Sequence, residues 1–380
     1  MMIRYETHPH SAAKRTLSGV ARVLLALQLD GPLLIGLALV SIYGLIVLYS
    51  ASGQDSAMVV RASVRLGVGA VAMLALAQVR PQQLRQAAPW LYALGLLLLL
   101  IVDMLGVIGK GAQRWLDLGV IRFQPSEIAK IAVPMLCAWY LHERPLPPSP
   151  FTLAALGVII LIPAGLTAAQ PDLGTAILIV IAGALVVLMA GLSMWYLVGA
   201  ALLAGAGGWL GWSMLREYQR ERVFTFIDPQ SDPLGAGYHI IQSQIAIGSG
   251  GLFGKGWMNG SQSQLEYLPE RHTDFIFAVI GEEFGLIGLL VLILLYLFVV
   301  ARALYLASQT QDTFSRLLAS SLALTFFVYI FINAGMVSGL LPVVGVPLPL
   351  VSYGGTSMVT LLAGFGILMA LCSHRKLIGS

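Results

Sequence analysis

The sequence predicts an all-α polytopic membrane protein with about ten transmembrane helices, both termini in the cytoplasm and a large extracytoplasmic loop between the seventh and eighth helices. Of the 380 residues, 58 % are apolar and 11 % are charged, whereas a soluble domain carries roughly 25 % charged residues. The apolar residues also fall into runs of about 18 or more, the length that crosses a bilayer. The composition therefore excludes a soluble globular protein, and it equally excludes a disordered chain.

Ten apolar runs are candidate spans. They cover residues 32–49, 59–76, 88–108, 127–141, 151–169, 173–192, 194–215, 284–305, 317–337 and 356–371. Together they form one predicted transmembrane domain, 32–373, between a cytoplasmic N-terminal tail, 1–31, and a cytoplasmic C-terminal tail, 374–380. We expect the first run to remain in the bilayer, because residues 1–31 do not resemble a cleavable signal peptide.

Lys and Arg in the short connections set the orientation, since they stay preferentially on the cytoplasmic side. Eleven lie on the side of the two termini and eight on the other, and five of those eight fall in the long segment 216–273, where the rule is weak. This segment is therefore predicted to be external. A long loop without structure of its own is uncommon, so we expect it to fold over the outer face, with a short helix at 238–248.

Ionisable residues within or next to the spans are costly and by default mark function. They gather in the predicted outer half: Arg61, Arg65, Asp103, Glu127, Lys130, Asp172, Asp274, Glu282 and Glu283, with the polar Asn333 in the ninth span. The inner halves of most spans are nearly free of charge. The pattern predicts a polar site that opens to the outer leaflet and the external space.

Structural alternatives stand beside this functional interpretation. Arg61 and Arg65 could extend to the lipid headgroups. Glu127 and Lys130 could form an internal ion pair, and Asp172 could serve only to start a helix. In the same way, the adjacent acids at 282 and 283 could mark the membrane surface, and the histidine at 272 could be an ordinary surface residue.

The outer loop 338–355 has an unusual composition. Residues 341–357, LPVVGVPLPLVSYGGTS, are rich in Pro and Gly yet carry no charge. Irregular backbone at membrane depth is tolerated only where it is buried in protein or lines a cavity. We expect this loop to re-enter the outer side of the bundle near the polar site. The alternative is an apolar loop that lies on the surface.

Metal chemistry finds no support in the sequence. The two cysteines, Cys137 and Cys372, exclude a disulfide framework and a Cys-based zinc site. No His-Glu-x-x-His spacing is present. No metal ligands are therefore predicted.

Four motifs in order resemble those of the SEDS family, the shape, elongation, division and sporulation proteins of bacteria. They are FQPSEIAK at 123–130, QPDLGTA at 170–176, PERHTDFIF at 269–277 with Gly-Glu-Glu at 281–283, and GVPLPLVSYGGTS at 345–357. The resemblance covers about residues 30–375. Arg271 before His-Thr-Asp and the short N-terminal tail favour the elongation branch of the family over the division branch.

The resemblance implies a peptidoglycan glycosyltransferase with ten transmembrane helices. Family members polymerise lipid II, an undecaprenyl-pyrophosphate-linked disaccharide pentapeptide, into glycan strands outside the bacterial cytoplasmic (inner) membrane during elongation and rod-shape maintenance. They work with a class B penicillin-binding protein that cross-links the strands, and with other membrane proteins of the elongation complex. We expect contacts with lipid II, the nascent strand and membrane lipids, and none with nucleic acid.

The same resemblance makes Asp274 the essential acid, which we interpret as the base for the acceptor hydroxyl. Basic residues near the leaving pyrophosphate would stabilise its growing charge, and the sequence does not rank them. The candidate substrate-binding residues are Arg61, Arg65, Lys110, Arg114, Glu127, Lys130, Asp172, Arg216, Arg220, His272 and Ser352. We expect an inverting displacement and no tightly bound cofactor, although a divalent cation, Mg²⁺ or Mn²⁺, could share the charge.

Two other functions remain open. A lipid II flippase would move a charged headgroup and should carry polar residues through both halves of the membrane. A non-catalytic scaffold for the transpeptidase would need no charges inside its spans.

Overall fold

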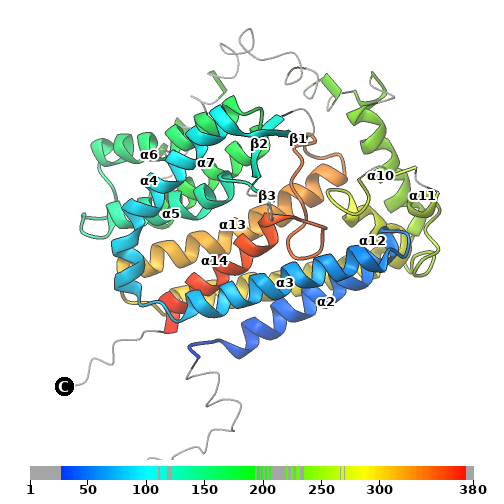
Figure 1. Ribbon diagram of the computed structural model, residues 1–380, viewed down its shortest axis with the longest axis horizontal. Coiled ribbons are helices and arrows are strands. Elements are labelled where there is room, and N and C mark those ends of the chain that lie inside the picture. Colours follow the sequence, from blue (N-terminus) through cyan, green and yellow to red (C-terminus); the bar gives the residue numbers. More distant parts are fainter. Residues whose placement is uncertain are drawn as a thin grey trace, which may run out of the picture.

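The computed structural model describes residues 27–109, 112–117, 122–192, 235–265, 267–268 and 270–373, with short pieces between 195 and 231. Nine of the ten predicted spans coincide with helices in this part of the chain (Figure 1). The helices are α2 (Gly31–Ala51), α3 (Ser56–Ala77), α4 (Pro81–Leu105), α5 (Ser126–Leu141), α6 (Pro150–Ala169), α7 (Leu173–Met189), α12 (Ile276–Ser308), α13 (Thr313–Val337) and α14 (Thr356–Ser373). The predicted span 194–215 falls mostly outside the described residues.

Seven of these helices are long and apolar enough to cross a membrane, whereas α5 and α7 have 16 and 17 residues. The polytopic helical class is therefore confirmed, and the count of ten spans stays a prediction. Most helices start where the sequence supplies a side chain that can accept a hydrogen bond from a free backbone N–H. Asp30, Asp55, Ser149, Asp172 and Asp312 each cap a helix in this way.

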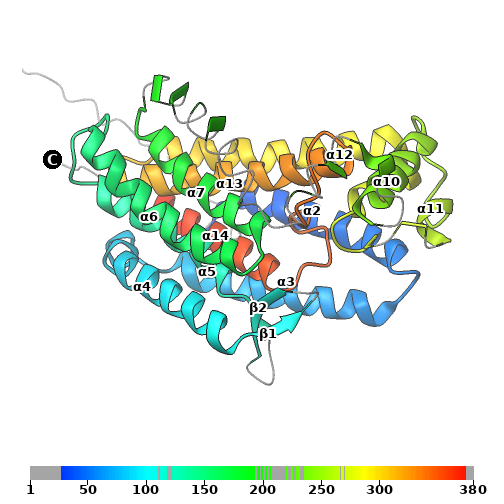
Figure 2. The same cartoon turned by 90° about the horizontal axis from the view of Figure 1, so that it is seen from above.

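Helix α13 lies in the middle of the bundle, where it packs on α5, α7, α12 and α14. The consecutive helices α3 and α4 have different neighbours, since α3 packs on α2 and α14 while α4 packs on α5 and α6 (Figure 2). The contact between α3 and α14 is close, because a Cβ atom on Gly366 would lie 2.4 Å from the carbonyl oxygen of Met73.

The two ends of the described chain meet at one end of the bundle. Ser373 Oγ donates to the carbonyl of Gln28 at 2.9 Å, and Arg302 donates twice to Asp30, at 2.9 and 2.7 Å. Helices α10 (Ala236–Gly250) and α11 (Ser261–Gln264) lie at the opposite end (Figure 1). The short helix predicted at 238–248 is thus confirmed as α10. The cytoplasmic placement of the terminal tails stays a prediction, and residues 1–26 and 374–380 lie outside the described residues.

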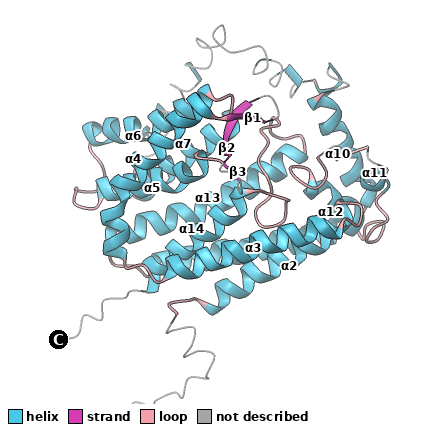
Figure 3. Ribbon diagram, viewed as in Figure 1, coloured by secondary structure: helices cyan, strands magenta, loops and turns pink. Residues whose placement is uncertain are grey.

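The prediction of an all-α chain was incomplete, because the connection between α4 and α5 forms three short antiparallel strands (Figure 3). These are β1 (Val107–Gly109), β2 (Ala112–Asp117) and β3 (Arg122–Phe123), with Val107 paired to Trp115 and Leu116 paired to Phe123. The predicted third span ran to residue 108, but Gly106 is extended and ends α4 at Leu105.

Helix α12 begins eight residues before the predicted eighth span and is interrupted at Gly285, whose φ is +66°. Glu282 and Glu283 precede this kink and are buried, at 0 % and 1 % exposure. Their carboxylates are therefore enclosed by protein, and their level relative to the membrane surface stays a prediction.

The loop 338–355 contains no helix or strand, and much of it is buried. Val346, Leu348, Leu350, Val351 and Ser352 are each at most 3 % exposed. The interpretation as irregular backbone buried within the protein is therefore confirmed, and the alternative of a surface loop is wrong.

Candidate active site

Asp274 lies in the turn that leads into α12, and a buried amide fixes its backbone. Asn333 Nδ2, on α13, donates to the carbonyl of Asp274 at 2.8 Å and to that of Val346 at 2.7 Å. The Asp274 side chain is half-buried. A Cβ atom on Gly345, whose φ is +72°, would lie 3.5 Å from Asp274 Oδ2. The loop 338–355 therefore passes directly beside the carboxylate.

Two further residues of this loop hold the segment before Asp274. Ser352 Oγ donates to the carbonyl of Thr273 and accepts from Leu348 N–H at 2.8 Å. The Tyr353 N–H donates to the carbonyl of His272 at 2.8 Å, and the rings of these two residues meet edge to face at 6.3 Å. Ser352 was predicted as a substrate contact, but its buried hydroxyl is engaged with the backbone. Its geometry is that of a residue that positions the loop.

Arg61 and Arg65 reach the same loop from α3. The Arg65 guanidinium lies 4.4 Å from the centre of the Tyr353 ring, and Arg61 Nε donates to the Tyr353 hydroxyl at 3.3 Å. Arg61, whose side chain is 52 % exposed, also pairs with Asp55 at 3.4 Å. Both guanidinium groups thus engage protein groups, so extension to the headgroups does not by itself account for them.

The pair of Glu127 and Lys130 is buried at the start of α5. Their charged atoms are 2.7 Å apart, and their side chains are only 6–7 % exposed. The Lys130 ammonium also lies 5.2 Å from the centre of the Tyr329 ring, a favourable cation–π contact. The expected internal ion pair is therefore present. Lys130 also contacts α13 through Tyr329, a contact that the sequence did not predict.

A cavity opens beside this pair, between α5, α13 and α14. Glu127, Lys130, Tyr329, Thr325 and Thr360 give it polar walls, and the rest is apolar, with Phe326, Phe365 and Leu368 among the lining residues. The buried Thr325 hydroxyl makes no hydrogen bond within the described part of the chain. A buried cation and an unmet hydroxyl facing one cavity are suited to a ligand that carries oxygen atoms.

A fourth cation, Arg114 on β2, binds the turn before α7. It donates to the carbonyls of Gln170 and Pro171 and lies 3.6 Å from Asp172 Oδ1. Gln124 Nε2 donates to Asp172 Oδ2 at 2.9 Å. The helix-start role of Asp172 is confirmed, because its Oδ1 also accepts from Thr175 N–H at 3.2 Å, but that role is combined with contacts to two other motifs.

These groups converge around the loop 338–355. A Cβ atom on Gly174 would lie 2.4 Å from the Val344 carbonyl oxygen, and one on Gly355 would lie 3.7 Å from the Trp115 ring. Tyr329 packs against Val346 on one side and faces Lys130 on the other. The structure therefore brings Arg61, Arg65, Arg114, Lys130, Glu127, Asp172, His272, Ser352 and Asp274 to one end of the bundle.

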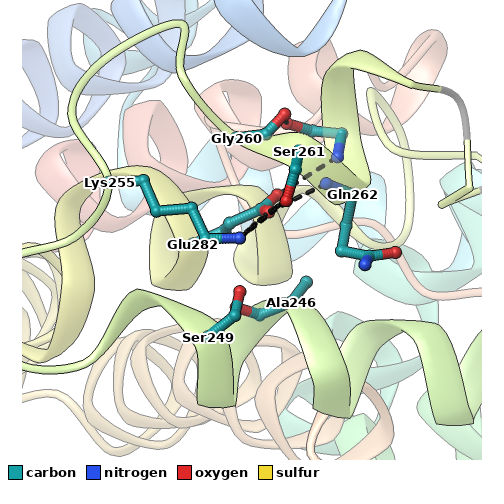
Figure 4. Close-up of polar contacts among 8 residues, drawn as sticks. Ala246, Ser249, Lys255, Gly260, Ser261, Gln262 and Glu282 are labelled. Carbon is teal, nitrogen blue, oxygen red and sulfur yellow. Dashed lines mark hydrogen bonds and ion pairs between the residues drawn. The ribbon is translucent and has the colours of Figure 1, made fainter.

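Two buried carboxylates of α12, Glu282 and Glu283, join it to the segment before Asp274 and to α2. Glu282 pairs with Lys255 at 2.7 Å and accepts from the backbone N–H of Gln262 (Figure 4). It also accepts from the backbone N–H of Ser263. Glu283 accepts from the Ser50 hydroxyl on α2. We call residues 251–265, which Glu282 binds at Lys255, Gln262 and Ser263, the clamp segment.

Some predicted residues are not placed at the site. Lys110 and Arg216 lie outside the described residues. Arg220 is half-buried within a short described piece of the loop, and its relation to the site stays a prediction. Sequence reasoning missed Tyr329 and Tyr353. The spacing of Tyr329 from Asn333, four residues on one helical face, was a usable signal.

This arrangement defines a class, a polytopic helical membrane protein whose buried and half-buried charges gather at one end around an irregular apolar loop. The sequence matches the model of the cell cycle protein family that comprises FtsW, RodA and SpoVE, over residues 32–377. The chain belongs to this family.

Curated relatives agree over nearly the whole length. The chain is 53 % identical to the peptidoglycan glycosyltransferase MrdB of Escherichia coli K12 over 353 residues, which cover 92 % of this chain and 95 % of that protein. It is 31 % identical to the peptidoglycan glycosyltransferase RodA of Treponema pallidum, over 90 % of this chain and 97 % of that one.

Two solved structures are similar. One, described as the structural coordination of polymerization and crosslinking by a peptidoglycan synthase complex, has a TM-score of 0.82 at 34 % identity and covers 92 % of this chain and 98 % of the other. The other is the crystal structure of the rod shape determining protein RodA of Thermus thermophilus, with a TM-score of 0.70 at 31 % identity, covering 91 % and 97 %.

Proposed function

We propose that the chain, a peptidoglycan glycosyltransferase of this family, polymerises lipid II with Asp274 as the general base. The supporting observation is the way Asp274 is held. Asn333 and Ser352 fix the backbone at and before this residue, while its carboxylate stays half-buried beside Gly345. A base needs such a fixed position and an open side toward its substrate.

The chemistry is a single displacement. The Asp274 carboxylate takes the proton from the sugar 4-hydroxyl of the acceptor, and that oxygen attacks the anomeric carbon of the muramyl donor. The bond from this carbon to the lipid pyrophosphate breaks, so the anomeric centre is inverted and no covalent enzyme intermediate forms.

Cations at the site would stabilise the pyrophosphate as its charge grows. Lys130 faces the cavity and is the first candidate; Arg114, Arg61 and Arg65 follow. Glu127 and Asp172 orient their basic partners, since each accepts from or pairs with one. The apolar part of the cavity would hold the start of the undecaprenyl chain.

We propose no tightly bound cofactor, and a divalent cation, Mg²⁺ or Mn²⁺, would act only together with the substrate phosphates. No group of three or more His, Cys, Asp or Glu suited to a metal occurs among the described residues.

We propose that the enzyme works in the bacterial cytoplasmic membrane with its site facing outward. Its partner would be a class B penicillin-binding protein within the elongation complex, and its ligands lipid II, the growing strand and membrane lipids. Both terminal tails would be cytoplasmic, the bundle would have ten spans, and 216–273 would be the external loop.

The test is polymerisation of labelled lipid II by the purified protein in bilayers, with its transpeptidase partner present. We expect Asp274→Asn to fold normally and to lose about 10²–10⁴-fold in rate, the contribution of a general base. Asp103→Asn, at an exposed carboxylate on α4, is the matched control and should retain activity.

Normal polymerisation by Asp274→Asn would show that this residue is not the base. Inactivity of the wild type alongside its partner would instead favour lipid II transport, which a flipping assay on the same vesicles would detect.

A further inference from the structure

Residues 251–258 form a turn that follows α10 and exposes large apolar side chains. Phe253 is 79 % exposed, Leu252 60 % and Trp257 45 %. Such a concentration of apolar surface is unusual in a loop that faces water.

This turn packs along the kinked part of α12. The N–H groups of Leu286 and Ile287 donate to the carbonyls of Gly251 and Leu252 at 3.0 and 3.1 Å. In return, the N–H groups of Lys255 and Gly256 donate to the carbonyls of Glu282 and Glu283, at 3.0 Å each. A Cβ atom on Gly254 would lie 2.2 Å from the Glu283 carbonyl oxygen, so only glycine allows this approach.

The depth of the turn follows from the polar anchor at the other end of the bundle, where Asp30 and Arg302 pair. From Asp30 to Ile46 the sixteen residues of α2 rise about 24 Å at roughly 1.5 Å each. From Arg302 to Ile287 the fifteen residues of α12 rise about 22 Å. When the near edge of the hydrocarbon core, which is about 30 Å thick, is placed at this ion pair, both positions lie several ångströms inside the far edge.

Trp257 lies at this depth, since its Nε1 donates to the carbonyl of Ile46 at 3.2 Å and its ring lies 6.0 Å from that of Tyr49. Tryptophan and tyrosine favour the membrane–water boundary. Lys255, the only charged residue of the turn, is directed to Glu282 (Figure 4). These backbone hydrogen bonds and the ion pair give many of the polar groups of the turn a partner within the protein, as a lipid environment requires.

We propose that residues 251–258 form a wedge inserted into the bilayer, in which Leu252 and Phe253 contact phospholipid acyl chains and Trp257 lies at the headgroup boundary. Lipid is the occupant because the wedge continues an apolar face that the spans already expose. Ile46, Leu286, Ile287 and Leu290 on this face are 45–47 % exposed.

The wedge would also fix the height of the active site. Glu282 and Glu283 join it to the start of α12, which directly follows Asp274. A substrate anchored by a lipid presents its reacting sugar at a set height above the bilayer. A wedge bound at the membrane edge would keep Asp274 at that height.

The test uses the full-length protein in phosphatidylethanolamine–phosphatidylglycerol nanodiscs, with Cys372→Ser leaving the fully buried Cys137 as the native thiol. A nitroxide is attached at Phe253→Cys, and its collisions with lipid-soluble oxygen and with a water-soluble nickel chelate are compared. Leu290→Cys, on the exposed face of α12, is the lipid control, and Gln54→Cys, exposed in the turn after α2, is the aqueous control.

We expect the oxygen-to-nickel collision ratio at 253 to match that at 290 and to exceed that at 54 severalfold. A ratio like that at 54 would overturn the proposal. Shielding from both reagents would also overturn it, because a protein partner would then cover the wedge.

A functional measurement tests the link to the site. Phe253→Asp should lower lipid II polymerisation severalfold in bilayers but not in detergent, and Phe253→Leu should restore it. Equal activity of Phe253→Asp and the wild type in bilayers would overturn the role in setting the height of the site, independently of whether Asp274 is the base.

Discussion

Two Glu–Lys pairs, Glu127 with Lys130 and Glu282 with Lys255, have the same 2.7 Å separation and different surroundings, since Lys130 is buried and Lys255 is 28 % exposed. Glu282 also accepts hydrogen bonds from two backbone N–H groups, so its carboxylate has a structural role. Lys130 instead faces a cavity whose Thr325 hydroxyl is unmet within the described residues. The comparison shows that a free hydrogen-bonding group beside the pair, rather than burial or pairing, distinguishes a functional pair from a structural one. We call Glu127 with Lys130 the site and Glu282 with Lys255 the brace.

The largest expected effect is on stability, at the brace. Glu282→Ala removes the acceptor for Lys255, Gln262 and Ser263 at once, and each buried donor left unsatisfied costs about 1–3 kcal/mol. We expect a lower unfolding midpoint and faster proteolysis within the clamp segment. Glu282→Gln keeps the shape and should lose less. An unchanged midpoint for Glu282→Ala would show that the clamp segment is not held by this carboxylate.

A smaller effect, on rate, is expected at the cavity. The double variant Glu127→Gln/Lys130→Met avoids an unpaired buried charge and removes the cation that faces the substrate. We expect about a 10²–10³-fold loss of kcat, the usual cost of one electrostatic stabiliser, with a midpoint near that of the wild type. Glu282→Gln/Lys255→Met is the matched control, because it neutralises both partners in the same way, and it should change the rate far less. Equal losses of kcat in both variants would erase the distinction between site and brace.

The sequence predicted the parts of this comparison that depend on composition. Runs of apolar residues located nine described helices, and Pro and Gly without charge located the buried loop 338–355. The motif resemblance located Asp274. Each of these features is local in the chain, so a pattern can show it.

What the sequence could not show depends on partners distant in the chain. Lys255 and Glu282 are separated by 27 residues and obey no period, so Glu282 could equally have marked the membrane surface. Ser352 could be assigned to substrate until its bond to the Thr273 carbonyl was seen. The three strands were missed because they have only three, six and two residues, and because β1 begins inside the apolar run assigned to the third span.

The smallest expected effects concern two hydroxyl groups, that of Ser261 beside the Glu282–Lys255 pair and that of Thr325 beside the Glu127–Lys130 pair. Ser261 Oγ accepts from Lys255 at 2.8 Å and lies 3.2 Å from Glu282 Oε1, whereas Thr325 faces the cavity unmet. Ser261→Ala should therefore cost about 1 kcal/mol of stability and leave KM unchanged. Thr325→Val keeps the shape, so stability should hold or rise by about 1 kcal/mol, while KM for lipid II rises about 2- to 10-fold, the worth of one hydrogen bond. Steady-state polymerisation and thermal unfolding measure both quantities. An unchanged KM for Thr325→Val would mean that the substrate does not use this hydroxyl, and the cavity would then be a gap in packing beside Lys130.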